Sequence, residues 1–152
     1  MRFPKPIRLA PEAYANPDNV FHLVLRTHPE VGDLPLRVRE TVWESVLEQR
    51  DGNRIVLVAA CLMRDHLHLV ARPGPLSIIQ FLDRWKSWST RLAWSAGHQG
   101  PLWQPSAWDR ALRNEQEFAA AVEYVLRNPV AAGLVELTEE WPHAWSEGCL
   151  RP

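Results

Sequence analysis

The sequence predicts an α+β fold in which an antiparallel sheet has helices packed on one face. Two observations lead to this prediction. Short apolar stretches alternate with longer stretches of helical periodicity, in the order β-α-β-β-α-β-α. Two neighbouring apolar stretches are joined by the polar dipeptide Arg64-Asp65, which is typical of a β-hairpin. This order of elements is that of the split βαβ, ferredoxin-like layout.

The first half of the chain supplies a strand, a helix and a hairpin. Residues 19–27 alternate in side-chain type and predict a strand. Residues 36–49 carry a stripe of valines at helical spacing, and the Asp-Gly pair that follows closes the helix. Residues 54–63 predict a continuous apolar strand, and residues 66–72 predict its hairpin partner.

The second half begins with a long amphipathic helix over residues 76–96, with Ser77 near its N-cap. Residues 103–112 alternate loosely and predict an edge strand. Asn114 then has a glutamate three residues further on, which is the form of a capping box at the start of another helix.

The end of that last helix is marked by an Asn-Pro pair. We expect the helix to end near Asn128, and Pro129 to begin a short second helix that Gly133 ends. The tail over residues 141–145 is expected to be a loop that packs across the sheet.

Composition narrows the class of protein. A chain of 152 residues with 46% hydrophobic residues has the size of one domain, here 1–152 with a core of about 19–146. No apolar run is long enough to span a membrane, and no apolar segment follows the basic residues near the N-terminus. Two cysteines are too few for a disulfide scaffold. We therefore expect a cytoplasmic protein.

Charge is distributed unevenly along the chain. The net charge of −1 gives no overall attraction to nucleic acid, but five basic residues face two acidic ones between residues 83 and 113. These five are candidates for phosphate contacts: Arg84, Lys86, Arg91, Arg110 and Arg113. Taken singly, each is more typical of a solvated surface. Most of the eight tryptophans are expected in the core, and one or two could stack on bases.

Two short clusters carry side chains suited to chemistry. His66 and His68 alternate along one strand and therefore point to the same face, where two imidazoles can bind a divalent metal. The alternative is a solvated face that happens to carry histidines. Tyr124 and Asn128 lie one helical turn apart, so the Asn128 oxygen could complete a metal site beside the phenol. The alternatives are an N-cap for Asn128 and a half-buried rim position for Tyr124.

These clusters resemble a known family. The stretch 61–70, which contains His66-Leu67-His68, resembles the HUH motif of single-tyrosine transposases, and 124–135 resembles the C-terminal signature of REP-associated tyrosine transposases. The segments 22–27 and 103–113 also resemble that family in the same order. The resemblance covers about residues 19–146.

The resemblance implies an HUH nuclease-like, ferredoxin-like domain that cleaves and rejoins single-stranded DNA. By position, His66 and His68 would bind Mg²⁺ or Mn²⁺, Tyr124 would be the nucleophile, and Asn128 a candidate third ligand. The implied substrate is hairpin DNA of REP-like palindromes, cleaved through a 5′-phosphotyrosine. The implied protein is nucleoid-associated and a monomer, with a dimer as the alternative.

Other functions stay open at this point. Ala131 replaces a residue that is basic in many relatives, and the charge is slightly negative, so a catalytically weak or inactive module that binds nucleic-acid hairpins is the alternative. A zinc site formed by the two histidines with Cys61 and Cys149 lacks any standard ligand spacing.

Overall fold

An antiparallel sheet forms the centre of the fold, with the strand order β4-β1-β3-β2-β5. The computed structural model describes residues 8–148. The strands are β1 (Val20–Arg26), β2 (Ile55–Leu62), β3 (His66–Pro73), β4 (Trp108–Leu112) and β5 (Ala144–Ser146). Strand β3 is central, so the side chains that it carries are enclosed by neighbours on both sides.

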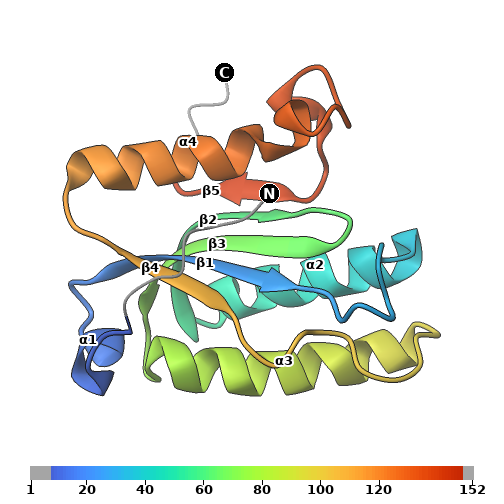
Figure 1. Cartoon of the computed structure of the whole chain (residues 1–152), viewed down its shortest axis with the longest axis horizontal. Helices are drawn as coiled ribbons and strands as arrows, with labels where there is room; N and C mark the ends of the chain where they lie inside the picture. The colour runs from blue at the N-terminus through green and yellow to red at the C-terminus, as the bar shows by residue number, and fades with distance from the viewer. Residues whose placement is uncertain (1–7, 149–152) are drawn as a thin grey trace.

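Helices cover both faces of this sheet. They are α1 (Pro11–Ala15), α2 (Leu36–Asp51), α3 (Ile78–Ser95) and α4 (Glu115–Ala131), with a 3₁₀ turn η1 (Thr138–Glu140). In Figure 1, α2 and α3 lie below the sheet, and α4 lies above it together with η1. No helix of the described residues is long and apolar enough to cross a bilayer.

The α+β class and the antiparallel sheet are confirmed, and so are two helix starts. The Ser77 hydroxyl accepts a hydrogen bond from the backbone N–H of Gln80, whose side chain accepts one from the N–H of Ser77. The Asn114 side chain accepts from the N–H of Glu117. Both caps satisfy N–H groups that the first turn leaves without helical partners.

The expectation of helices on one face is wrong. In β3, Leu67 and Leu69 belong to the core formed with α2 and α3, whereas Val70 belongs to a second core that includes Val125 of α4. A strand buried on both faces has apolar side chains at consecutive positions, as β2 does over Ile55–Leu62. That continuous apolar run was a local sign that a helix covers each face.

The Asn-Pro pair does not end the last helix. Helix α4 continues through Pro129, and the N–H of Ala132 donates to the carbonyl oxygen of Asn128 at 2.9 Å. Gly133, with φ of +74°, ends the helix in the left-handed conformation. Proline removes one helical hydrogen bond here, only two residues before the last helical residue, and Pro129 is buried.

The tail is also more regular than expected. Ala144–Ser146 forms β5 and pairs with β2, whose edge would otherwise be open. The Trp141 indole N–H donates to the carbonyl oxygen of Leu62 at 2.9 Å and anchors the tail. A strand of three residues has no measurable periodicity, so local sequence could not predict it.

Candidate functional site

Two imidazoles of β3 lie side by side on the α4 face of the sheet. As the strand alternation predicts, His66 and His68 point to the same face, and their Nε2 atoms are 3.1 Å apart. His68 is fully buried and His66 is partly exposed. The interpretation as a solvated polar face is therefore wrong for His68.

A third imidazole, which sequence reasoning did not single out, extends this pair. His22 of β1 places its Nε2 atom 3.0 Å from Nδ1 of His68, and Asp65 places Oδ1 2.7 Å from Nδ1 of His66. A continuous chain of hydrogen bonds therefore runs from Asp65 through His66 and His68 to His22. His22 lies on the same face of β1 as Val20, Val24 and Arg26, and a polar side chain at that position was the available signal.

The donors in this chain can be arranged in two ways. Because a carboxylate only accepts, Nδ1 of His66 carries the proton and Nε2 of His66 is an acceptor. His68 then either donates from Nε2 to His66, or donates from Nδ1 to His22. In the second tautomer the Nε2 atoms of His66 and His68 are both unprotonated, so both have a lone pair available for one ion.

That second arrangement suits a divalent cation. Two nitrogens bound to one ion at bond lengths of roughly 2.1 Å and near-right angles lie about 3 Å apart, as these two do. Within residues 8–148 no cluster of three or more His, Cys, Asp or Glu side chains forms a metal site, so further ligands must come from other groups. Two imidazoles with an amide oxygen nearby are a donor set that a divalent metal ion accepts.

Burial keeps the His68 and His22 rings neutral. It lowers the pKa of His68 well below its ordinary value, and the charges of His66, His22 and Arg26 act in the same direction. Burial, followed by the charge of Arg110, lowers the pKa of His22 to about 4. Neutral imidazole is the form that binds metals, so the lowered pKa of His68 favours that ring as a metal ligand.

The lowered pKa of His22 predicts acid sensitivity of the fold. The unfolded chain takes up this proton near pH 6.5 and the folded chain only near pH 4, so stability falls as pH drops through that window. We expect His22 alone to reduce the free energy of unfolding by about 3 kcal/mol between pH 7 and pH 4. Urea unfolding across this range measures the change, and a flat profile would contradict it.

Helix α4 brings the phenol to the same place. The Tyr124 ring centroid lies 5.6 Å from that of His68 and 6.0 Å from that of His22. Burial raises the pKa of the Tyr124 phenol, while a hydrogen bond from the Asn128 side chain and the charge of Arg26 lower it. The phenol is therefore protonated at neutral pH and is held by groups that favour its anion.

Asn128 is part of this site and not a helix cap. It lies inside α4 with 7% of its surface exposed, which corrects the N-cap interpretation. His66, Tyr124 and Asn128 line one cavity of about 280 Å³, here called the histidine cavity. Arg26 and Arg64 line it as well, although neither was singled out in the sequence analysis.

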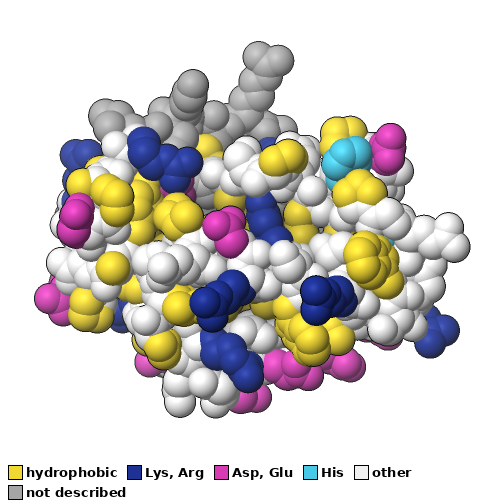
Figure 2. Space-filling view, turned by 90° about the horizontal axis from the view of Figure 1, so that it is seen from below, with side chains coloured by type: hydrophobic (Ala, Val, Ile, Leu, Met, Phe, Trp, Pro, Cys, Tyr) yellow, Lys and Arg dark blue, Asp and Glu magenta, His cyan; other side chains and the backbone are white. Residues whose placement is uncertain are grey.

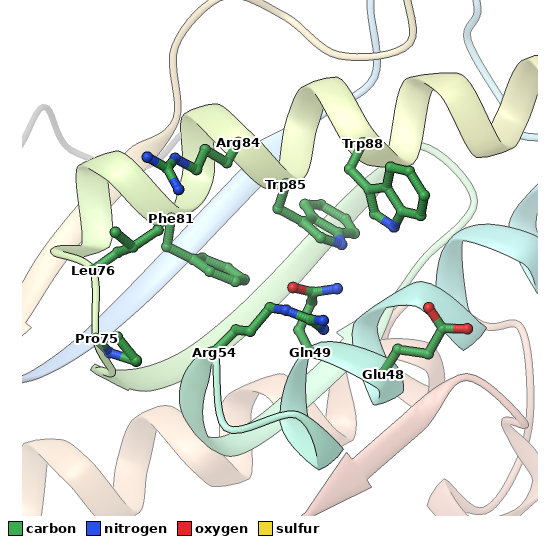
Figure 3. A pocket seen from close by; sticks show the side chains of 9 residues that line it. All are labelled: Glu48, Gln49, Arg54, Pro75, Leu76, Phe81, Arg84, Trp85 and Trp88. Carbon is green, nitrogen blue, oxygen red and sulfur yellow. The ribbon is translucent and has the colours of Figure 1, made fainter.

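The five basic residues selected from the sequence do not form one surface. Arg110 of β4 lies on the α4 face near His22, whereas Arg84 and Arg91 are exposed on α3 on the opposite face, which Figure 2 views. Arg84 lines a cavity of about 610 Å³ between α2 and α3, shown in Figure 3. Lys86 is partly buried and donates to the Gln104 carbonyl oxygen at 2.8 Å. Arg113 is exposed and lies just before α4.

The zinc alternative gains no support from the described residues. Burial raises the pKa of the Cys61 thiol to about 12, which disfavours the thiolate that zinc requires. The Cys61 sulfur lies 3.7 Å from the Met63 sulfur in the apolar layer under α4. Cys149 lies outside the described residues.

A known protein family matches the larger part of this chain. Residues 17–117 match the family model described as "Transposase IS200 like". The chain belongs to this transposase family. The matched range of the transposase model includes the three histidines and ends before Tyr124.

Individual relatives are similar to this transposase-family chain. The REP-associated tyrosine transposase of Escherichia coli (strain K12) is 28% identical over 81 residues, which are 53% of this chain and 48% of that protein. A protein of Haemophilus influenzae (strain ATCC 51907 / DSM 11121 / KW20 / Rd), provisionally given the same description, is 22% identical over 107 residues, with coverage of 57% and 56%. The chain spans about half the length of these curated relatives.

A solved structure shares the fold. It is a REP-associated tyrosine transposase bound to a REP hairpin, with a TM-score of 0.68 and 18% identity over 86% of this chain and 78% of that one. The resemblance to REP-associated tyrosine transposases is thereby confirmed.

Proposed function

We propose that this protein cleaves and rejoins single-stranded DNA at hairpin-forming repeats. Tyr124 is the nucleophile, and His66 and His68 hold Mg²⁺ or Mn²⁺ with the Asn128 oxygen as a candidate third ligand. The observation that carries the proposal is that side chains from β3 and α4 converge on the histidine cavity. Neither segment could bind and attack a phosphodiester alone.

The reaction transfers a phosphoryl group from the 3′ oxygen of the DNA to the Tyr124 oxygen. The Tyr124 oxygen forms a bond to phosphorus, the bond to the 3′ oxygen breaks, and the products are a 5′-phosphotyrosine and a free 3′-OH. When bound, the metal ion acts as a Lewis acid that offsets charge on the phosphate oxygens. Asn128 orients the phenol and Arg26 favours its anion. The phenol proton passes to water in the cavity, and the leaving 3′ oxygen takes up a proton from water to become the free 3′-OH. Attack by a 3′-OH reverses the reaction and rejoins DNA.

The substrate assignment comes from the relatives. The structural neighbour is bound to a REP hairpin, and the relatives are described as REP-associated. We infer hairpin DNA with single-stranded flanks as the substrate, a monomer as the working unit, and a place beside the nucleoid in the cytoplasm. We also infer that residues 1–152 act as one domain.

Covalent capture tests this function. The protein is incubated with a labelled single-stranded hairpin and Mn²⁺, and then denatured in SDS. With the label at the 3′ end of the DNA, which stays with the downstream fragment, we expect a shifted band, and no band with chelator or with blunt duplex. A cleaved product without any protein adduct would contradict the tyrosine mechanism.

A binding module without catalysis is the second candidate. It is favoured by the acidic surface beside α4, where Glu123, Glu136, Glu139 and Glu147 line one cavity of about 710 Å³. Such a surface repels the DNA backbone beside the helix that carries Tyr124, which disfavours cleavage there. Hairpin binding that survives metal removal, with no adduct under any metal, would favour this candidate.

His22 is expected to position His68 for metal binding. The His22→Phe variant loses the acceptor for Nδ1 of His68, so we expect Mn²⁺ affinity to fall by about 10- to 100-fold. The His22→Gln variant keeps an acceptor and should retain most of the affinity. Calorimetric Mn²⁺ titration of both variants is the measurement, and equal affinities for wild type and His22→Phe would contradict this role.

A further inference from the structure

Tyr124 borders two cavities. On one side is the histidine cavity; on the other is a cavity of about 330 Å³ at the β4 edge of the sheet. The second cavity, here called the β4 cavity, is lined by His22, Trp108, Arg110, Leu112, Glu117 and two alanines of α4, together with Tyr124. A phosphate at Tyr124 would therefore have the β4 cavity directly beside it.

We propose that the β4 cavity binds one unpaired nucleobase adjacent to the phosphate that Tyr124 attacks. Trp108 stacks on the base, and Arg110 provides charge for the adjoining backbone. This proposal rests on the proposed function, because it locates a part of the same DNA substrate.

The aromatic walls of the cavity suit a base. Trp108 contacts His22 edge-on, with ring centroids 5.1 Å apart and an angle of 80° between the planes. That contact fixes the indole while leaving it partly exposed toward the cavity. Stacking on a held aromatic ring accepts any base, since every base has a π-face. The volume also lies within the range of small-molecule sites, roughly 300–1,000 Å³.

The polar groups at the mouth of the cavity are held in place. Nη2 of Arg110 lies 3.4 Å from Oε1 of Glu117, and the other oxygen of that carboxylate accepts from the N–H of Arg113 at 2.8 Å. A guanidinium and a carboxylate side by side present donors and acceptors, as base edges do. Arg110 lines the same cavity as His22 and Trp108, so its charge is next to the space that the base would occupy.

The DNA strand has only a short distance to cover between Tyr124 and the β4 cavity. β4 is an edge strand that pairs with β1, and Trp108 lies opposite Val24, two positions from His22 along β1. A strand passing over Tyr124 reaches the β4 cavity on the same face of the sheet. By contrast, Trp88 and Arg84 line a cavity on the opposite face (Figure 3) and are not candidates for this contact.

Abasic scanning tests the proposal. The Tyr124→Phe protein is titrated with hairpins that lack one base at each position near the cleaved bond, and affinity is followed by fluorescence anisotropy. We expect one position where loss of the base weakens binding about tenfold. In a background with Trp108→Ala, binding of intact DNA should be weaker by the same factor, and the abasic site should have no further effect. Trp108→Phe keeps a ring and should retain most of the effect.

Matched variants on the opposite face serve as controls. Trp94→Ala removes an indole that is 52% exposed on α3, and it should leave the abasic effect unchanged. Arg110→Ala should reduce the slope of log affinity against log salt by about 0.7, whereas Arg37→Ala on α2 should not. A full abasic effect in the Trp108→Ala protein would overturn the proposal while covalent capture still stood. If loss of one base weakens binding only when Trp108 is present, but no covalent adduct forms, the proposed function alone is contradicted.

Discussion

Replacing Tyr124 with phenylalanine is expected to abolish covalent capture of DNA. The variant lacks the attacking oxygen but keeps the ring that packs 5.6 Å from the His68 ring, so hairpin affinity should change less than twofold or so. Loss of a nucleophile typically lowers turnover by about 10⁴-fold or more, which places the adduct below detection. SDS gels of the wild type and the variant with the same labelled hairpin are the measurement.

The chain offers a matched control for this substitution. It contains two tyrosines, and the other, Tyr14, donates its hydroxyl hydrogen to Asp109 at 2.7 Å in the core on the α3 side. Tyr14→Phe should therefore form the adduct as the wild type does. Equal adduct from the Tyr124 variant and the wild type would remove this tyrosine from the mechanism.

Removal of one imidazole of the pair is expected to have the second largest effect. With one nitrogen ligand left, the His66→Ala protein should bind Mn²⁺ at least about 100-fold more weakly and cleave about 10³-fold more slowly. His66 is the cleaner site because it is partly exposed. His68→Ala would have the same effect on metal but would also leave a void in a fully buried position, which costs about 1–3 kcal/mol of stability.

Metal titration and thermal unfolding separate these two effects. His98→Ala is the control, because His98 lies after α3 and its Nε2 atom bonds to the nearby Pro101 carbonyl oxygen. It should match the wild type in both measurements. Wild-type Mn²⁺ affinity in the His66→Ala protein would contradict the assignment of the metal pair.

Much of the fold could be predicted because it depends on local spacing. The hairpin of β2 and β3, the long helices and the caps at Ser77 and Asn114 all follow from neighbouring residues. The local rules failed where distant contacts decide the outcome. Pro129 remains inside α4, and Ala144–Ser146 becomes a strand because the edge of β2 is available to pair with it.

By itself, the sequence determined that two imidazoles share one face of a strand and that Tyr124 and Asn128 share one side of a helix. Both follow from the period of the backbone. The tertiary structure alone decided that these two faces meet, that His22 joins them, and that Arg84 and Arg91 of α3 lie on the opposite side of the sheet from α4 (Figure 1). Such placements depend on which sheet face each helix buries, and that choice is made by apolar side chains from distant segments packing together.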